Sequence, residues 1–478
     1  MKFGGTSVGS AERIRTVAEL ARDRGSRRVV LVVSALGGIT DLLIRGARLA
    51  LARDGSGAGV ADEVLSRHRA VITGLVDGRG QEALFAHLDG LVAELRSLYL
   101  GVYNLEELTQ RTLDAIAGIG ERASCEIVAA ALEAGGTPAA AVDSRRVVVT
   151  DESFGRAQPL MEETGVRIRE HVLPLVEKGV VPVVAGFIGA TRKGVATTLG
   201  RGGSDFTASI IGALLPAEEI QIWTDVDGMM TVDPRVVPGA RVIPEVSYAE
   251  AAELAYFGAK VLHPATIKPA VERGIPVFIL NTLNPSAPGT LIHLADESPG
   301  HGLRAERDSF PRSERGVQGR PNAASPLLND GPRAIAFKKG ITVVLISQPR
   351  MLMAYGFLAR VFDVFDRHRT PVDLIATSEV SVSLTVDDPE NIPAVQADLA
   401  ALGEVQVLRR MAIVSVVGRG FLRRAGLAAR VFQSLREVNV VMISFGASDV
   451  NVSLVVAEDE AEKAVRLLHH EFFEGGRG

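Results

Sequence analysis

The sequence predicts an α/β protein, with an open α/β/α sandwich followed by two ferredoxin-like α+β units. Unbroken apolar runs alternate with helical periodicity through residues 1–290, which is typical of a layered α/β domain. A stretch rich in Pro, Gly, Ser and Arg follows, and the rest of the chain repeats itself at an interval of 70 residues, from 356 to 426. We therefore expect a first domain over 1–295, a linker or insertion over 296–333, and two similar units over 334–410 and 411–478.

The first domain is predicted to contain a parallel sheet that is covered on both faces. Its apolar runs at 29–33, 180–185 and 275–280 lack polar alternation, as expected of strands that are buried on both sides. Two β-type stretches within 186–199 flank a turn at 192–194, which predicts a hairpin. A helix is predicted before the first run, because apolar residues recur at helical spacing at Ile14, Val17, Ala18 and Ala21.

Two copies of one pattern define the C-terminal repeat. Residues 356–362 (GFLARVF) align with 426–432 (GLAARVF), and 377–384 (TSEVSVSL) align with 447–454 (ASDVNVSL) in the same register. Each copy has the order strand, glycine turn, helix and two strands, and the alternation at 380–384 is that of a half-buried strand. The pattern predicts two ferredoxin-like units.

Composition excludes several classes of protein. The chain has 478 residues and a formal net charge of −5, so neither a nucleic acid nor an anionic membrane is an expected partner. The longest apolar runs are much too short to cross a bilayer. The single cysteine, Cys125, excludes a disulfide framework, indicates a reducing cytoplasm and is expected to be a small buried side chain.

Three glycine-rich or polar clusters stand at predicted strand ends, where ligands bind in open α/β sheets. Glycines allow a ligand to approach the backbone, and backbone N–H groups near a helix start bind phosphate oxygens. Each cluster also has a structural interpretation: a glycine turn, a helix cap at Ser204 or Asp205, or a pair of Asp-Gly and Asp-Pro turns. The clusters are 2–7 (KFGGTS), 200–205 (GRGGSD), and 223–228 (WTDVDG) with 231–235 (TVDPR).

Arg201 favours a ligand-binding role for the second cluster, because a guanidinium grips a carboxylate with two hydrogen bonds. Further candidates are Ser34 and Thr40, after the run at 29–33, and Glu121 at a predicted helix start. The sequence has neither a P-loop signature nor the catalytic loop of protein kinases, and it has no Cys/His set with zinc spacing. P-loop NTPases and protein kinases are therefore disfavoured.

In their order and spacing, these clusters resemble the aspartate kinases of the amino-acid kinase superfamily. The C-terminal repeat resembles the paired ACT domains of that family, and residues 356–358 and 372–380 are most similar to the lysine-sensitive type. The resemblance implies an amino-acid kinase fold and ATP-dependent phosphorylation of L-aspartate to 4-phospho-L-aspartate, which leads to lysine, threonine and methionine. The matching stretches cover nearly the whole chain outside the linker and include 2–8, 33–40, 154–156, 186–189, 198–205, 223–226, 233–235 and 257–264.

The resemblance also implies roles for individual residues. Lys2 would neutralise charge on the transferred phosphoryl group, and Asp205 would orient Lys2 or the phosphates. Mg²⁺ is expected to enter with ATP rather than through a protein-built metal site. The substrate-binding residues would be Ser34, Thr40, Glu121 for the ammonium group, Arg201 for the α-carboxylate, and Ser204. The nucleotide-binding residues would be Lys2, Gly4, Gly5, Ser7, Thr224, Asp225, Met230, Arg235, Lys260 and Val261.

An inhibitory amino acid, lysine or threonine, is implied as the effector of the repeat. Asp373 would hold its ammonium group, although Asp373 and Glu379 are also explained as solvated edge charges. Paired ACT modules associate across chains, so a homodimer or larger assembly is expected. The expected effector contacts are Met351, Gly356, Phe357, Leu358, Asp373, Thr377, Ser378 and Glu379.

Two other functions fit parts of the same pattern. One is a kinase of the same superfamily that acts on another acceptor, such as acetylglutamate or carbamate, but the repeat and the stretch 257–264 disfavour it. The other is an amino-acid sensor without catalysis, which would need only the repeat. The joint presence of Lys2, Glu121, Arg201 and Asp205 favours an enzyme.

Overall fold

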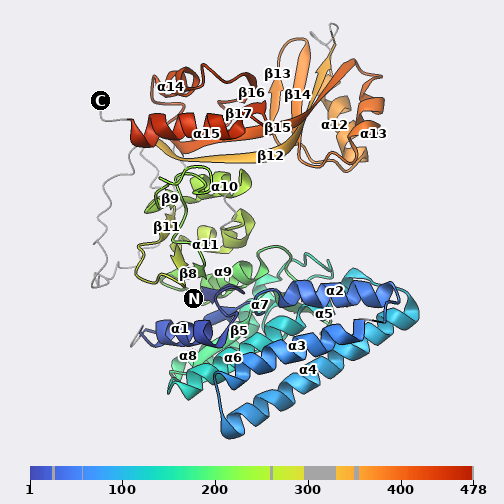
Figure 1. Cartoon of the computed structure of the whole chain (residues 1–478), viewed down its shortest axis with the longest axis vertical. Coiled ribbons are helices and arrows are strands. Elements are labelled where there is room, and N and C mark those ends of the chain that lie inside the picture. The colour runs from blue at the N-terminus through green and yellow to red at the C-terminus, as the bar shows by residue number, and fades with distance from the viewer. Residues whose placement is uncertain (24–26, 56, 259–261, 295–329, 349–354, 476–478) are drawn as a thin grey trace. The chain divides into compact units, whose positions relative to one another are not determined.

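The computed structural model describes residues 1–23, 27–55, 57–258, 262–294, 330–348 and 355–475, and it divides into two compact units (Figure 1). Most of the predicted linker, 295–329, therefore lies outside the described residues. The first unit comprises Met1–Met229, Val242–Tyr248 and Lys260–Leu294. The second comprises Met230–Arg241, Ala249–Ala259 and Ala295–Gly478, so two short segments of the N-terminal sequence belong to it.

An eight-stranded sheet forms the centre of the first unit, in the order β3-β5-β2-β1-β8-β10-β11-β9. Neighbouring strands are parallel except β10 and β11. The predicted apolar runs correspond to β2, β5 and β10, so the parallel sheet is confirmed. The strands are β1 (Lys2–Phe3), β2 (Leu31–Val33), β3 (Ala139–Val142), β5 (Val181–Ala185), β8 (Ile220–Thr224), β9 (Glu245–Ser247), β10 (Val277–Asn281) and β11 (Thr290–His293).

Helices pack against this sheet because its strands are apolar on both faces. Leu31 and Val33 of β2 belong to one large core with α1, α2 and α6, whereas the buried Val32 between them points to the opposite face. Cys125 of α6 is 2% exposed in this core, as expected. The helix α9 packs against β1, β2 and β8. The helices are α1 (Ala11–Arg22), α2 (Ile39–Leu51), α3 (Gly57–Thr73), α4 (Gly78–Leu105), α5 (Gln110–Ala117), α6 (Ile119–Ala134), α7 (Met161–His171), α8 (Leu173–Glu177), α9 (Gly203–Leu214) and α11 (Lys268–Arg273), with 3-10 turns at Ser144–Arg146 and Pro264–Ile267.

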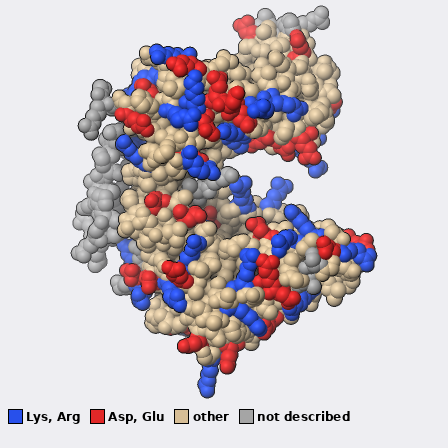
Figure 2. Space-filling view, in the orientation of Figure 1, with Lys and Arg blue, Asp and Glu red and all other residues tan. Residues whose placement is uncertain are grey.

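The long helices α3 and α4 pack on each other and on α2. Their outer faces carry both basic and acidic side chains, which form ion pairs. Arg69, for example, lies 2.8 Å from Asp89. Basic and acidic side chains are likewise interspersed over the face of the molecule shown in Figure 2. Among the described residues, no helix combines the length and the apolar character that a bilayer crossing requires.

The predicted hairpin within 186–199 is confirmed. Its strands β6 (Ile188–Thr191) and β7 (Ala196–Thr198) pair antiparallel, and β4 (Val149–Thr150) pairs parallel with β6 to form a separate three-stranded sheet. The end of β7 leads directly into the second glycine cluster and α9.

The prediction that Ser204 or Asp205 caps α9 is wrong. The N-cap is Gly202, which has φ = 71° and no capping side chain. Ser204 and Asp205 lie inside the first turn, and their side chains bond Ser34 and Lys2 instead. A left-handed glycine at this helix start therefore leaves both polar side chains available for tertiary contacts.

The second unit is built on a six-stranded sheet in the order β13-β14-β12-β15-β17-β16. Its two central strands, β12 and β15, are long and pair antiparallel along most of their length. The helix α10 (Tyr248–Tyr256) lies almost entirely in this unit. The other elements are β12 (Gly331–Ser347), α12 (Phe357–Arg367), β13 (Ile375–Thr377), β14 (Ser381–Val386), α13 (Ile392–Leu399), β15 (Glu404–Arg419), α14 (Leu427–Ser434), β16 (Val440–Ser444), β17 (Asn451–Ala457), α15 (Ala461–His469) and a terminal π-turn (His470–Glu474).

The repeat seen in the sequence is reproduced in three dimensions. The helices α12 and α14 begin after glycines with positive φ, Gly356 at 72° and Gly426 at 87°. Two cores result, but they do not follow the chain in order: Val344 of β12 packs with α12 and α13, whereas Ile335 of the same strand packs with α14 and α15. The boundary expected between 410 and 411 falls inside β15, which contributes to both halves.

Candidate functional site

The first glycine cluster forms a tight loop after β1. The N–H groups of Ser7 and Val8 both donate to the carbonyl of Gly4, at 2.9 and 3.2 Å. A Cβ on Gly5 would lie 2.9 Å from the carbonyl oxygen of Ala35, so only glycine fits there without a shift of the backbone. The loop therefore passes very close to the segment that follows β2.

A cavity of about 660 Å³ opens at the carboxyl ends of β1 and β2 and at the start of α9. This is the edge at which open α/β sheets bind ligands. All of the residues predicted for catalysis and substrate binding line it: Lys2 from β1, Ser34 after β2, Thr40 from α2, Glu121 from α6, and Arg201, Ser204 and Asp205 at the start of α9. The lining residues are Lys2, Gly5, Ser34–Gly38, Thr40, Asp41, Glu121, Phe187 and Gly200–Asp205.

Lys2 and Asp205 form an ion pair in this cavity. Lys2 Nζ lies 2.7 Å from Asp205 Oδ1, and both side chains are only 11% exposed. Asp205 stands in the first turn of α9, whose N-terminal dipole stabilises a negative charge there. Lys2 Nζ also lies beside Gly4, 3.5 Å from the place where a Cβ would stand. The pair thus holds a lysine ammonium group at a glycine-lined backbone turn.

Glu121 supplies a second carboxyl group to the cavity. It is 3% exposed in the first turn of α6, and one carboxyl oxygen, Oε2, has no hydrogen-bond partner among the described residues. Burial raises the pKa of Glu121 to about 7, against a smaller lowering by backbone hydrogen bonds, including that of Ala35. A buried carboxyl oxygen without a partner is suited to bind a cationic ligand group.

Hydroxyl groups line the cavity near these charges. Ser34 donates a hydrogen bond to Ser204 Oγ at 2.9 Å, which ties the end of β2 to α9. Thr40 and Arg201 also line the cavity, and the side chain of Arg201 is exposed. The cavity is therefore lined by two cationic groups, three carboxyl groups (Asp41, Glu121 and Asp205) and several hydroxyls.

The residues predicted to bind the nucleotide are distributed more widely. Ser7 is buried and its hydroxyl bonds Thr282 Oγ1 at 2.7 Å, so it does not line the cavity. Thr224 bonds its neighbour Asp225 at 3.2 Å at the end of β8, outside the cavity lining. Met230 and Arg235 belong to the second unit, where Arg235 pairs with Asp233 at 2.6 Å. Lys260 and Val261 lie outside the described residues.

Several functional candidates were missed by the sequence interpretation. Asp41 follows Thr40 in the first turn of α2, and this position after a glycine pair was a usable signal. Phe187 lines the cavity with φ = 70°, and nothing in the sequence around a phenylalanine indicates this left-handed conformation. Thr282, the partner of Ser7, likewise carries no local signal because the two are distant in the chain.

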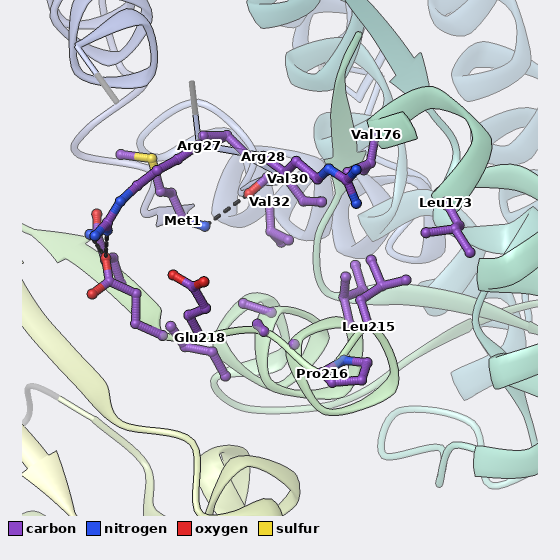
Figure 3. A pocket seen from close by; sticks show the side chains of 18 residues that line it. Met1, Arg27, Arg28, Val30, Val32, Leu173, Val176, Leu215, Pro216 and Glu218 are labelled. Atoms are coloured by element: carbon purple, nitrogen blue, oxygen red, sulfur yellow. Dashed lines mark hydrogen bonds and ion pairs between the residues drawn. The ribbon is translucent and has the colours of Figure 1, made fainter. Parts of the chain in front are cut away.

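A second cavity, of about 600 Å³, opens at the opposite edge of the sheet, before the amino ends of β1, β2 and β8 (Figure 3). The terminal ammonium of Met1 donates to the carbonyl of Val30 at 2.8 Å, and Arg27 pairs with Glu219 at 3.4 Å. Apolar side chains such as Leu215 line most of the remaining wall. Arg27 and Glu219 pair with each other here, unlike the carboxyl oxygen Oε2 of Glu121 in the first cavity, which has no partner among the described residues.

The predicted effector residues lie at two places in the second unit. Asp373, just before β13, accepts a hydrogen bond from the hydroxyl of Tyr256 in α10. Burial raises the pKa of Asp373 to about 6, and the neighbouring Asp387 acts in the same direction. The other carboxyl oxygen of Asp373 has no hydrogen-bond partner among the described residues.

The remaining effector candidates surround α12 and the far end of β13. Phe357 packs into the core at the start of α12, whereas Leu358 is 41% exposed. Thr377 ends β13, and the Ser378 hydroxyl bonds Ser381 Oγ at 2.7 Å in the next turn, beside the exposed Glu379. Met351 lies outside the described residues.

Comparison with known proteins agrees with this architecture. The model of the amino acid kinase family matches residues 1–281, and an ACT domain model matches 414–472. The lysine-sensitive aspartokinase 3 of Escherichia coli is 35% identical, over 99% of this chain and 98% of that protein. The crystal structure of E. coli aspartokinase III with aspartate and ADP (R-state) superposes with a TM-score of 0.79 at 34% identity, and the complex with lysine and aspartate (T-state) with 0.76 at 33%; each comparison covers 99% of both chains.

The fold is that of an amino acid kinase with a C-terminal ACT region. The similarity extends over nearly the full length of both this chain and its relative. The chain belongs to the aspartokinase family.

Proposed function

We propose that this protein transfers the γ-phosphoryl group of ATP to the side-chain carboxylate of L-aspartate, yielding ADP and 4-phospho-L-aspartate. The observation that carries the proposal is the cavity in which the Lys2–Asp205 pair lies together with Arg201 and Glu121. Aspartate has two carboxylates and one ammonium group. The cavity offers the cationic groups of Lys2 and Arg201, and a carboxyl oxygen of Glu121 that has no hydrogen-bond partner among the described residues.

In this proposal, Arg201 binds the α-carboxylate and Glu121 binds the ammonium group. The side-chain carboxylate then points toward Lys2, where an oxygen attacks the γ-phosphorus as the bond to ADP breaks. No proton needs to move, so the protein contributes positioning and charge stabilisation. Lys2 neutralises charge on the phosphoryl oxygens, and Asp205 holds Lys2 in place.

The glycine turn after β1 is suited to a polyphosphate because backbone without side chains lets phosphate oxygens approach, and the ammonium group of Lys2 lies beside Gly4. Mg²⁺ is proposed to arrive bound to the ATP phosphates and to keep several of its waters. The nucleotide roles of Thr224, Asp225, Met230, Arg235, Lys260 and Val261 remain predictions, as does a cytoplasmic location.

Formation of an acyl phosphate tests the proposed reaction. Incubation with Mg-ATP and L-aspartate in the presence of hydroxylamine should give an aspartate-dependent hydroxamate. The assay should be run with acetylglutamate and carbamate as alternative acceptors. No signal above the blank with any acceptor would favour an amino-acid sensor without catalysis.

We further propose that the ACT region binds lysine as an inhibitor and that the protein self-associates. The lysine complex of E. coli aspartokinase III supports the first idea. The second is supported by apolar side chains that are exposed at equivalent positions of the two repeats. They are Phe362 and Phe432, both 37% exposed, and Ile375 and Phe445, 42% and 44% exposed.

A further inference from the structure

A buried carboxyl group outside the cavity joins two loops, one of which lines the cavity. Asp114 stands in α5 and is 3% exposed. Its Oδ2 accepts the N–H groups of Gly155 at 2.8 Å and Thr198 at 2.9 Å, and its Oδ1 accepts the Thr198 hydroxyl at 2.8 Å. Among the described residues, no ion pair includes Asp114, so its bonds are all to uncharged donors.

One of the two loops leads to the cavity, and the other packs against it. Thr198 ends β7, and the next residues, Leu199 to Gly202, carry Arg201 to the cavity wall. Gly155 belongs to the loop that precedes α7, and the carbonyl of Thr198 accepts the N–H of Ala157 at 2.9 Å. A Cβ on Gly200 would lie 3.2 Å from the carbonyl oxygen of Gly155, so the two backbones touch beside Arg201.

Burial of the Asp114 carboxyl group disfavours its charged form. Burial raises the pKa of Asp114, and the three hydrogen bonds lower it only in part. A buried carboxylate is retained at low cost only when donors satisfy it, and here both loops supply those donors. Leu199, the residue after Thr198, donates in turn to the carbonyl of Phe187, which lines the cavity.

We infer that Asp114 is a positioning residue that fixes the loop of Arg201 and thereby sets the affinity for the amino-acid substrate. The inference rests on the proposed function, since it takes Arg201 as the clamp for the α-carboxylate. Asp114 does not touch the cavity itself. Its effect should therefore fall on the KM for aspartate, while the nucleotide, which is proposed to bind the turn after β1, is little affected.

The test is Asp114→Asn in the full chain. An amide keeps the volume but removes the carboxylate charge from all three hydrogen bonds, and its NH₂ group fits only opposite the Thr198 hydroxyl, which must then accept instead of donate. We expect the KM for aspartate to rise at least tenfold, the KM for ATP to change less than twofold, and kcat to change less than fivefold. Equal rises in both KM values, or an unchanged KM for aspartate, would overturn the inference.

The chain offers a matched control in Asp151. Its carboxylate also accepts two backbone N–H groups, of Ser153 at 3.1 Å and Gln158 at 2.9 Å, and the Ser153 hydroxyl at 3.0 Å. It holds only the Gly155 loop, one of the two loops that Asp114 joins, and makes none of these bonds to the Arg201 loop. Asp151→Asn should leave the KM for aspartate within twofold of the wild type, and a rise equal to that of Asp114→Asn would also contradict the inference.

If Asp114→Asn does not fold, Thr198→Val and Thr198→Ser decide the question. Valine removes one of the three bonds and should raise the KM for aspartate about threefold or more, whereas serine keeps the hydroxyl and should restore the wild-type value. Equal values for the two variants would reject the inference. Failure of the proposed reaction is distinguishable, because the wild-type protein would then form no aspartyl hydroxamate at all.

Discussion

The ammonium group of Lys2 lies 2.7 Å from the carboxylate of Asp205, and this largely buried ion pair stands at the carboxyl edge of the sheet. β1 and α9 supply the two residues, although they are far apart in the sequence. Partial burial strengthens the attraction between the charges, and the open side of the pair faces the cavity.

Lys2→Met should lower kcat by about 100-fold or more, because it removes a preorganised charge at the transferred phosphoryl group. The KM for aspartate should change much less. Initial rates of hydroxamate formation provide the measurement. Lys339→Met is the matched control, since Lys339 pairs with Glu462 on the surface of the second unit. Near-normal turnover of Lys2→Met would show that the role proposed for Lys2 is wrong.

Arg201→Ala should raise the KM for aspartate by roughly tenfold to a hundredfold, which corresponds to a charged hydrogen-bonded contact of about 1.5–3 kcal/mol. Titration of aspartate at saturating Mg-ATP would measure it. Arg192→Ala is the control, because Arg192 pairs only with Glu163 on the exposed hairpin turn of the same unit. If the two variants have the same KM, Arg201 does not bind the substrate.

The affinity for aspartate should depend on pH through Glu121. Burial raises its pKa to about 7, so the ionised form that pairs with an ammonium group is present above that pH and is lost as the pH falls. The KM for aspartate should increase about tenfold between pH 8 and pH 6, as expected for one titrating group. Glu121→Gln should have a high KM that is flat over this range, and a slope identical to that of the wild type would exclude Glu121 as the titrating group.

Tyr256→Phe should weaken lysine binding. In the structure the Tyr256 hydroxyl donates to Asp373, the carboxylate proposed for the effector ammonium group, and this bond lowers a pKa that burial raises. Loss of a hydrogen bond worth about 1 kcal/mol favours the neutral carboxyl group and should raise the lysine concentration for half-maximal thermal shift about fivefold.

Two further variants give this measurement its controls. Tyr103→Phe, in α4 of the first unit, should not change the response to lysine. Asp373→Asn should abolish or greatly weaken it. A Tyr256→Phe protein with the wild-type response would mean that lysine does not use Asp373.

Self-association should require the apolar side chains exposed on the repeats. Ile375→Asp together with Phe445→Asp places charges on both equivalent positions and should shift the protein to monomer in sedimentation velocity. Leu100→Asp provides the comparison, because Leu100 is a 59% exposed apolar residue of α4 in the first unit. An assembly that survives the double substitution must use another surface.

Much of the fold followed from local pattern. The runs that became β2, β5 and β10 were recognisable because a strand covered on both faces must be apolar throughout. The repeat was recognisable because Gly356 and Gly426 occupy the same left-handed position before equivalent helices. The gathering of Lys2, Ser34 and Arg201 also followed from general topology, since the carboxyl ends of parallel strands share one edge.

The sequence by itself determined the apolar strands β2, β5 and β10, the C-terminal repeat, and the two glycine clusters that meet at the edge of the sheet, because periodicity and glycine punctuation are local properties. Only the tertiary structure decided that Ser7 turns to Thr282, that Asp114 holds Thr198, and that one half of β12 packs with the second repeat. Such pairings depend on how distant segments approach after folding. That approach sets the direction and the partner of each side chain, and neither can be inferred from residue type and spacing alone.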